Sequence, residues 1–432
     1  MALLGVACVL APAAASAGGF SNPDFGIRRL GMFAVTARPD DGTALFHNPA
    51  GLTLEQGTRF YHAQSWFFPN LGIRLYDSEG YLHPEHEIQP TLNVGAIPFL
   101  GGSFDLGSPR LRLAVGVYAP NAYGAMLPDD EATRYYVTEA LFVAARATAA
   151  VGWAVTEKMS LGGSLSLIPV YLTATRKINA LVLAEPDRRF DPVSATEDFD
   201  STLELDGRDL TLAADLGVIL RPLPTLRLGA AFASGSPVTL EGDVRLTNPD
   251  GSEVRTRHRT RMTLPFTLRA GFNWEFAPDF QLGADIYYWH YQVFQEQRTE
   301  LDEPILGMAE LVDPKNYGNC WAWNAGLLYR LHPRLELLAG YQQDFTPIPE
   351  RTFTLDNPTR DQSGVSLGAR WQVNERWRIG VAFVRNWFEL ADVQTSLANP
   401  PANMKGHGGN TEFGFDLSWA PWAEGVATEA DR

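Results

Sequence analysis

Cysteine and long apolar runs are both scarce in this 432-residue chain. Of the two cysteines, Cys8 lies in a short apolar stretch at the N-terminus, which leaves Cys320 alone in the rest of the chain. A disulfide or a thiolate metal site within one mature chain is therefore excluded. After the first stretch no run of 18 apolar residues occurs, and this excludes a bundle of membrane-spanning helices.

Basic residues are also in deficit, since 35 Lys and Arg against 50 Asp and Glu give a net charge of -15. Neutralising phosphates needs a basic surface, so we expect no nucleic-acid partner. The stretch His83-Pro84-Glu85-His86-Glu87 has ligand-type residues, but its proline and loop setting argue against the helical geometry of metalloproteases. The acidic stretch from Glu185 to Asp209 lacks the regular spacing of calcium loops. We expect neither a metal site nor a cofactor.

The N-terminus carries a secretion signal. Residues 1–17 are small, apolar and uncharged, and they end in Ala15-Ser16-Ala17, which is typical of a signal peptide with its cleavage site. The mature chain then begins at Gly18. At the other end, residues 420–432 form a polar C-terminal tail.

Strict alternation of apolar and polar residues is the main periodicity of the mature chain. In the clearest stretch, one parity from Met262 to Phe276 is apolar and the other, from Arg261 to Glu275, is mostly polar. This pattern predicts a single strand with one oily face. Fourteen segments show such a pattern: 58–68, 90–99, 110–119, 137–153, 158–173, 206–221, 225–235, 261–276, 280–295, 321–330, 334–345, 363–373, 376–387 and 411–419.

The lengths of the connections distinguish a soluble β protein from a membrane barrel. Short connections such as 154–157 and 222–224 alternate with long ones such as 174–205 and 236–260, although residues 100–109 form a longer connection where a short turn is expected. Short periplasmic turns and long external loops produce this alternation. The predicted fold is all-β, a 14-stranded antiparallel transmembrane barrel over residues 58–419, in the bacterial outer membrane.

Tryptophans gather at the two ends of the predicted strands, as expected for rings at the lipid–water interfaces. The periplasmic set is Trp153, Trp274, Trp371, Trp377 and Trp419, with Trp422 just beyond; the external set is Trp66, Trp289, Trp321, Trp323 and Trp387. Tryptophans that cap the core of a soluble sandwich are the alternative, but so many oily outer faces would expose more apolar surface than a monomer tolerates.

If the apolar parity faces lipid, the polar parity faces the barrel lumen. We expect these lumenal side chains to be solvated or ion-paired and to hold a plug in place. They are Arg146, Asp215, Arg269, Glu275, Asp285, Arg370, Arg378 and Asp416.

Residues 18–57 have no clean strand period and could fill a barrel of this width. Their segments Arg28-Arg29-Leu30-Gly31-Met32, Asp40-Asp41 and Asn48-Pro49-Ala50-Gly51-Leu52 resemble the N-terminal hatch of the FadL and toluene-transporter family. Residues 263–289 and 326–368, including Thr346-Pro347-Ile348-Pro349, resemble the strand pairs and a Pro-rich external loop of the same family.

This resemblance implies a 14-stranded barrel with its hatch inside, which takes up long-chain fatty acids or aromatic hydrocarbons. It implies a lateral exit where the third strand is kinked near the Asn-Pro-Ala triplet, so that Asn48, Pro49 and Ala50 with Pro120 and Asn121 would form the gate. Gly116 or Pro120 could break the third strand. An ordinary turn leading from the plug into the first strand is the alternative role for the triplet.

Candidate ligand contacts are less distinctive. The hatch aromatics Phe20, Phe25, Phe33 and Phe46 could line the substrate pocket, or could simply pack the plug against the wall. Arg255, Arg257, Arg259 and Arg261 share one parity that would continue the lumenal face of the eighth strand, and they could attract a fatty acid carboxylate or lipopolysaccharide phosphates. A solvated external hairpin is the alternative interpretation.

Other function classes are less favoured by the sequence. A barrel enzyme acting on lipids needs a nucleophile with a base, and no Ser/His/Asp arrangement is suggested, so we expect no catalytic residues. A structural or adhesive barrel is disfavoured by the plug-like N-terminus. The expected partners are a hydrophobic small molecule and outer-membrane lipids, with the protein as a monomer.

Overall fold

The computed structural model describes residues 19–77, 79–80, 82, 87–91, 94–179, 191–192, 195–357, 359–398 and 401–422. The predicted signal peptide lies outside these residues, as do positions 83–86, 185–190 and 193–194 of the two rejected metal stretches and positions 423–432 of the tail. Within the described residues, no helix is both long and apolar enough to cross a membrane.

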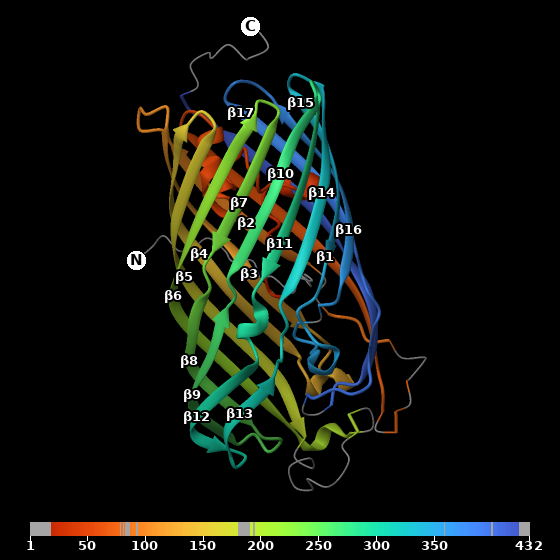
Figure 1. The fold of residues 1–432 in the computed structure, drawn as a ribbon. Coiled ribbons are helices and arrows are strands. Elements are labelled where there is room, and N and C mark those ends of the chain that lie inside the picture. The colour runs from red at the N-terminus through yellow and green to blue at the C-terminus, as the bar shows by residue number, and fades with distance from the viewer. Residues whose placement is uncertain are drawn as a thin grey trace.

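Fourteen antiparallel strands close into one barrel, which confirms the predicted fold class (Figure 1). Each strand pairs with the next, and the last pairs with the first. In ring order they are β1 (Arg59–Leu75), β2 (Gly95–Phe104), β3 (Leu111–Met126), β4 (Glu139–Thr156), β5 (Met159–Asn179), β6 (Asp200–Leu223), β7 (Leu226–Ala233), β10 (Thr267–Ala277), β11 (Phe280–Trp289), β14 (Cys320–His332), β15 (Leu335–Asp344), β16 (Gln362–Gln372), β17 (Trp377–Phe388) and β19 (Met404–Trp419).

The second strand is displaced from its predicted position. It was expected at 90–99 but runs from Gly95 to Phe104, so the unusually long connection after it shrinks to residues 105–110. The adjacent glycines Gly101 and Gly102 carry no side chain, and they hide the alternation that marks a strand.

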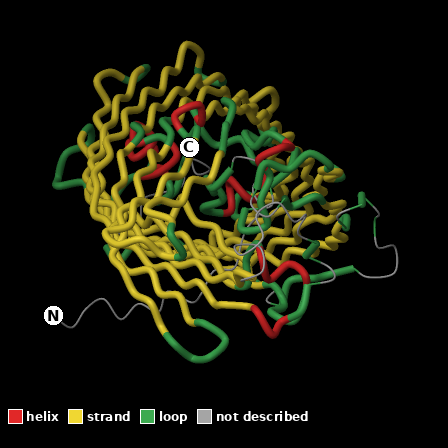
Figure 2. Tube along the Cα trace, turned by 90° about the horizontal axis from the view of Figure 1, so that it is seen from below, coloured by secondary structure: helices red, strands yellow, loops and turns green. Residues whose placement is uncertain are grey.

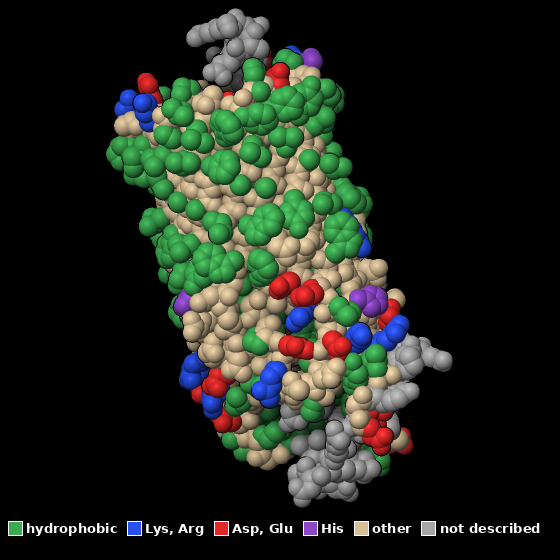
Figure 3. All heavy atoms as spheres, turned by 45° about the vertical axis from the view of Figure 1, so that its right-hand side comes forward, with side chains coloured by type: hydrophobic (Ala, Val, Ile, Leu, Met, Phe, Trp, Pro, Cys, Tyr) green, Lys and Arg blue, Asp and Glu red, His purple; other side chains and the backbone are tan. Residues whose placement is uncertain are grey.

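The outer face of the barrel is apolar. Leu165, Leu212 and Leu367 are more than 60% exposed, and they lie on the parity that points away from the lumen. Figure 3 shows hydrophobic side chains spread over a broad band of one face, while charged side chains gather mainly towards the loop end. Because a soluble monomer does not tolerate such a band, this surface is suited to lipid.

Four further strands prolong the wall beyond this band at the loop end, at the bottom of Figure 1. They are β8 (Ser236–Thr247), β9 (Glu253–Leu264), β12 (Glu296–Ile305) and β13 (Met308–Pro314), and they follow β6 in the pairing order β6–β8–β9–β12–β13. A short strand, β18 (Ala391–Val393), pairs with β19.

The apolar face of the wall changes from the outside to the inside of the barrel where these extra strands begin. The prediction of one strand over 261–276 with one oily face is wrong, because β9 ends at Leu264 and β10 starts at Thr267. Met262 and Leu264 are buried inside, whereas Leu268 is exposed outside. Pro265 lacks the N–H that would continue the ladder, and beyond the bilayer the outer face meets water rather than lipid.

The lumen holds the segment from Gly19 to Gly57, which we call the hatch (Figure 2). It contains α1 (Ile27–Met32), α2 (Ala44–His47) and the 3-10 helix η1 (Pro49–Leu54), and almost all of its residues are buried up to Leu52. Short 3-10 turns lie outside the hatch: η2 (Ala132–Tyr135), η3 (Glu197–Phe199), η4 (Tyr291–Val293) and η5 (Glu350–Thr352).

The tryptophans follow their expected places with one exception. Trp153, Trp321, Trp323 and Trp371 are each about half exposed on the outer surface. Trp289 was expected at the external interface, but it is only 2% exposed, and its indole N–H donates to the hydroxyl of Ser21 at 3.1 Å. That correction follows from parity, since the outward residues of β11 are even-numbered and Trp289 is odd.

Candidate functional site

Charged side chains of the barrel wall hold the hatch from several directions. Asp285 on β11 accepts the backbone N–H groups of Val35 and Thr36 at 2.7 and 2.8 Å, and Asp416 on β19 accepts the N–H of Ile27 at 3.1 Å. These buried carboxylates satisfy backbone donors that would otherwise lack partners.

Ion pairs add to this support at the short-turn end. Arg370 bridges Asp40 of the hatch and Glu336 of β15, at 2.6 Å to each carboxylate. Arg378 pairs with Glu55 at 3.0 Å, and Glu275 pairs with Arg38. Arg269 donates to the carbonyl of Phe46, while Arg146 and Asp215 pair with each other. All eight side chains expected to be lumenal therefore point inward.

The Asn-Pro-Ala triplet presses into the wall at β5 to β7. The Asn48 amide donates to the carbonyls of Val218 on β6 and Ala230 on β7, at 3.2 and 3.3 Å, and its oxygen caps η1 by accepting the N–H of Ala50 at 3.1 Å. Wall glycines make room, since a Cβ on Gly217 would lie 2.0 Å from the Asn48 oxygen. The triplet thus lies at β5 to β7 and not at the kink of the third strand. The expectation that the triplet and Pro120 form one gate is therefore wrong.

The third strand itself does not end at Pro120 but is bulged there. Its register against β4 shifts by one residue between Tyr118 and Asn121, whereas Gly116 is paired regularly on both sides. On the other side, pairing with β2 stops at Phe99 opposite Tyr118, although β3 continues to Met126. Proline cannot donate to a ladder, so the seam between β2 and β3 is open beyond this point.

The start of the hatch occupies the open edge of β3. The Asn22 N–H donates to the Pro120 carbonyl at 2.7 Å, the Ala122 N–H donates to the Phe20 carbonyl at 3.2 Å, and Ser21 and Asn121 form an antiparallel bridge. Residues 20–22 thus supply the hydrogen bonds that β2 does not.

The Phe20 side chain sits in a ring of aromatic side chains inside the barrel. Its centroid lies 5.1 Å from that of Tyr291, 5.7 Å from Phe142 and 6.0 Å from Phe294, all in edge-on geometry. Its backbone N–H donates to the Tyr291 hydroxyl at 3.1 Å. Edge-on pairs at these distances are attractive, so these three rings, which we call the Phe20 seat, retain the start of the hatch.

These rings belong to a larger apolar cluster that lines the loop half of the lumen, which we call the loop-side cluster. Its members come from hatch, wall and loops, and they include Phe20, Tyr123, Val170, Met262, Cys320 and Phe353. A polar pair lies at its edge, where the ammonium of Lys315 is 2.6 Å from Asp313. Burial opposes the charge of Lys315, but the carboxylates of Asp313 and Asp356 raise its pKa well above the usual value.

The other predicted pocket aromatics lie apart from Phe20. Phe25 and Phe46 contact each other at 5.1 Å and pack against Phe99 and Tyr118, whereas Phe33 lies with α1 against β14 to β17. All four predicted phenylalanines are at most 4% exposed. Phe20 alone among them touches the loop-side cluster.

The arginines predicted to attract ligands face outward. The side chains of Arg255, Arg259 and Arg261 are 51 to 64% exposed and pair with glutamates on the same or neighbouring strands. Arg257 has the same parity and is exposed. The expected continuation of the lumenal face is wrong, because the wall inverts between β9 and β10 and places these residues on the outer surface.

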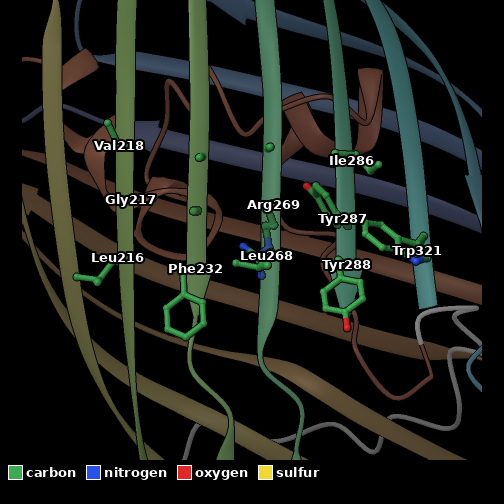
Figure 4. Close-up of a pocket in the computed structure, with 13 residues that line it drawn as sticks. Leu216, Gly217, Val218, Phe232, Leu268, Arg269, Ile286, Tyr287, Tyr288 and Trp321 are labelled. Atoms are coloured by element: carbon green, nitrogen blue, oxygen red, sulfur yellow. The ribbon is translucent and has the colours of Figure 1, made fainter. Parts of the chain in front are cut away.

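Two hollows lie along the outer wall. One, of about 520 Å³, is bounded by Leu216, Phe232, Leu268 and Tyr288 over β6 to β11 (Figure 4). The other, of about 870 Å³, includes Leu100 on β2 and Val115 and Val117 on β3, beside the open seam. Both are apolar and match the acyl chains of a bilayer.

Sequence reasoning missed Phe142, Tyr291 and Phe294, which surround Phe20. A usable signal was present, because residues 140–144, 167–172 and 286–289 are almost entirely apolar on both parities. Such a strand touches lipid on one face and an apolar interior on the other.

Comparison with known proteins identifies the fold and the family. The family model described as "Outer membrane protein transport protein (OMPP1/FadL/TodX)" matches residues 8–414. No curated protein matches the sequence.

Among solved structures, a Pseudomonas aeruginosa FadL homologue is similar at 16% identity and a TM-score of 0.81, covering 93% of this chain and 100% of its own. The toluene transporter TodX of P. putida gives 17% and 0.71, with coverage of 94% and 99%, and the toluene transporter TbuX of Ralstonia pickettii gives 15% and 0.67, also with 94% and 99%. At such identities these likenesses establish the fold. The family match covers nearly the whole chain, and the protein therefore belongs to the OMPP1/FadL/TodX family of outer-membrane transport proteins.

Proposed function

We propose that this protein takes up hydrophobic small molecules, long-chain fatty acids or aromatic hydrocarbons, across the outer membrane and releases them sideways through the β2–β3 seam. The observation that carries the proposal is the pairing of Phe20 to Asn22 with the edge of β3 that β2 leaves open. The segment that closes the wall therefore also carries the Phe20 ring, which fills the aromatic cluster inside it.

The route follows from where apolar surfaces lie. A ligand enters among the loops, reaches the loop-side cluster and displaces the Phe20 ring from between Phe142 and Tyr291. Withdrawal of residues 20–22 opens the seam, and the ligand passes to the outer hollow at Leu100 and Val117. Transfer of an apolar solute from one apolar surface to the next is favourable only while the solute stays out of water. A lateral exit into the bilayer meets this condition.

Only the beginning of the hatch needs to move in this scheme. Asp285, Arg370 and Asp416 hold the rest to the wall through buried ion pairs and hydrogen bonds. We propose that one chain acts as a monomer, since β1 pairs with β19 and closes the barrel within a single chain. We also propose that its role is transport without catalysis, in line with the transport proteins that its family describes.

A reversible lock tests the gate. In a Cys320→Ala background, Ser21→Cys with Asn121→Cys places two thiols on bridge partners, and their oxidation should abolish uptake of radiolabelled oleate and toluene by cells until a reductant is added. The matched control is Thr53→Cys with Ser160→Cys, whose native hydroxyls are 2.8 Å apart and which fixes η1 to β5.

We expect the control lock to leave uptake unchanged. Uptake that persists through the first lock would contradict a gate at residues 20–22. A block by both locks would mean that the whole hatch must move instead.

A further inference from the structure

Residues 20–22, which we call the gate segment, are held from two sides of the lumen. On one side their backbone pairs with the edge of β3. On the other side they meet Trp289, the last residue of β11, and Tyr291 in η4. The indole N–H of Trp289 donates to the Ser21 hydroxyl at 3.1 Å, and the Tyr291 hydroxyl accepts the Phe20 N–H at 3.1 Å. The gate segment thus joins β3 to the end of β11.

The hydrogen bond of Trp289 depends on the closed gate. An indole N–H donates but does not accept, so it needs an acceptor atom, and Trp289 is only 2% exposed. Its cross-strand partner on β14 is Cys320, whose thiol is a weak acceptor. Both residues belong to the apolar loop-side cluster, where water is a poor substitute for the Ser21 hydroxyl. Withdrawal of the gate segment therefore leaves a buried donor without a good partner, which costs free energy.

The ligand arrives where this donor is released. In the proposed route the ligand takes the place of the Phe20 ring, and Ser21 is the next residue of the chain. The side chains of Phe20 and Trp289 pack in the same loop-side cluster. A plain hydrocarbon in this place offers the Trp289 N–H no partner, whereas a molecule with an acceptor oxygen can replace the Ser21 hydroxyl. The open gate is then lower in free energy with the second ligand than with the first.

The charge of the surroundings favours a neutral acceptor. Trp289 and Tyr291 are uncharged donors, and an ionised carboxylate among apolar side chains loses its hydration without gaining a counter-charge. Lys315 is a cation at the edge of the loop-side cluster, but its ammonium is already paired with Asp313 at 2.6 Å. The oxygen of a ketone or an ester can accept the same hydrogen bond at a smaller desolvation cost.

We infer that Trp289 determines specificity, and that the preferred substrates carry a neutral hydrogen-bond acceptor, such as a ketone or ester oxygen, on an apolar body. This inference rests on the proposed gate at residues 20–22 and narrows the class of hydrophobic substrate. As the gate opens, the Trp289 N–H passes from the Ser21 hydroxyl to the ligand. A site built to hydrogen-bond one group of its substrate discriminates strongly against the analogue that lacks this group.

Competition between matched ligands tests the inference. Detergent-solubilised full-length protein is given equal amounts of decanoate, nonylbenzene and nonanophenone, a ketone that differs from nonylbenzene by its carbonyl oxygen. The retained ligands are extracted, quantified by mass spectrometry and divided by the amounts in protein-free micelles. The native protein should retain at least about fivefold more nonanophenone than nonylbenzene, as expected for one net hydrogen bond, and less decanoate than nonanophenone.

A substitution at Trp289 assigns the preference to its N–H group. Trp289→Phe keeps an aromatic ring but has no donor, so the ratio of nonanophenone to nonylbenzene should fall below about twofold. The matched control is Trp321→Phe, because Trp321 is half exposed on the outer surface, and this variant should keep the native ratio. A Trp289 ring that only packs would change the retention of both ligands by the same factor and leave their ratio as it is.

A second variant tests the same bond from the side of the hatch and leaves the barrel unaltered. Ser21→Ala removes the acceptor, so the Trp289 N–H lacks its partner while the gate is still closed. Opening the gate then no longer breaks this bond. Retention of nonanophenone and of nonylbenzene should rise together, by about threefold or more, and their ratio should stay native.

The outcomes separate the inference from the proposed function. Equal retention of nonanophenone and nonylbenzene by the native protein, or more decanoate than nonanophenone, would overturn the inference and leave uptake of hydrophobic molecules standing. A native ratio in Trp289→Phe, or unchanged retention in Ser21→Ala, would overturn the role of Trp289. Retention of none of the three ligands would count against the proposed function as well.

Discussion

The two halves of the barrel interior are built on opposite principles. In the short-turn half, the lumen is filled by the hatch, and buried charges such as Arg370 and Asp285 bind it residue by residue. In the loop half, side chains such as Phe142 and Val170 form an apolar lining, and Phe20 is the hatch residue whose side chain packs within it. Directional bonds hold one part still, whereas non-directional packing allows another apolar group to replace Phe20.

The largest effect should come from the ionic half. Arg370→Met removes the partner that the half-buried carboxylates of Asp40 and Glu336 share, and it leaves Asp40 with Arg28 and Arg38. Breaking a fully buried pair costs about 3–5 kcal/mol, which sets the upper bound here. We expect a clear fall in the thermal unfolding midpoint of the hatch, measured by hydrogen exchange of the hatch amides as the temperature is raised. Arg255→Met, at an exposed arginine paired with Glu253, should leave the midpoint unchanged, and equal shifts in the two variants would contradict a special role for the buried network.

A smaller effect is expected where the hatch is pressed into the wall. In Gly217→Ala the new methyl group would overlap the Asn48 oxygen, and relieving this should cost about 1–3 kcal/mol and loosen η1. Gly163→Ala is the control, since its Cβ would meet neighbours only at 3.6 Å. Hydrogen exchange of residues 48–54 measures the difference, and similar protection in both variants would show that the close approach of Asn48 is not what holds η1.

The smallest effect belongs to the apolar half. Tyr291→Phe removes the hydroxyl that accepts the Phe20 N–H but keeps the ring, so the seat should weaken by about 0.5–1.5 kcal/mol. Exchange of the Phe20 amide should quicken by about three- to tenfold, while barrel amides stay protected. Tyr341→Phe, on the outer face, should have no such effect. Unchanged exchange at Phe20 in Tyr291→Phe would mean that packing alone keeps the gate shut.

The sequence sufficed for the barrel because lipid on one face forces period-two alternation on every strand, as in the stretch from Leu268 to Phe276. It also sufficed for the inward direction of Asp285 and Arg370. It failed at Pro265, where a break in the ladder let the two faces exchange places, and at Gly101 and Gly102, where no side chain marks a face.

The candidate site was harder to predict, because its contacts join residues far apart in the chain. Phe20 could be named as a pocket residue, but not its seat, since Tyr291 lies 271 positions away. Likewise the resemblance pointed to Asn48 and to Pro120 as parts of one gate. Only the fold shows that they lie apart, with Asn48 bonded to Val218 and the Pro120 carbonyl bonded to the N–H of Asn22.

The bond between Ile27 and Asp416 spans 389 positions and constrains the order of assembly. The hatch is synthesised first, yet its last anchor becomes available only when β19 has zipped to β1. Until then the hatch lacks this contact with the wall, and contacts between residues so far apart in sequence form slowly. We therefore expect docking of the N-terminal hatch to be completed at the end of folding, although this segment is made before the barrel strands.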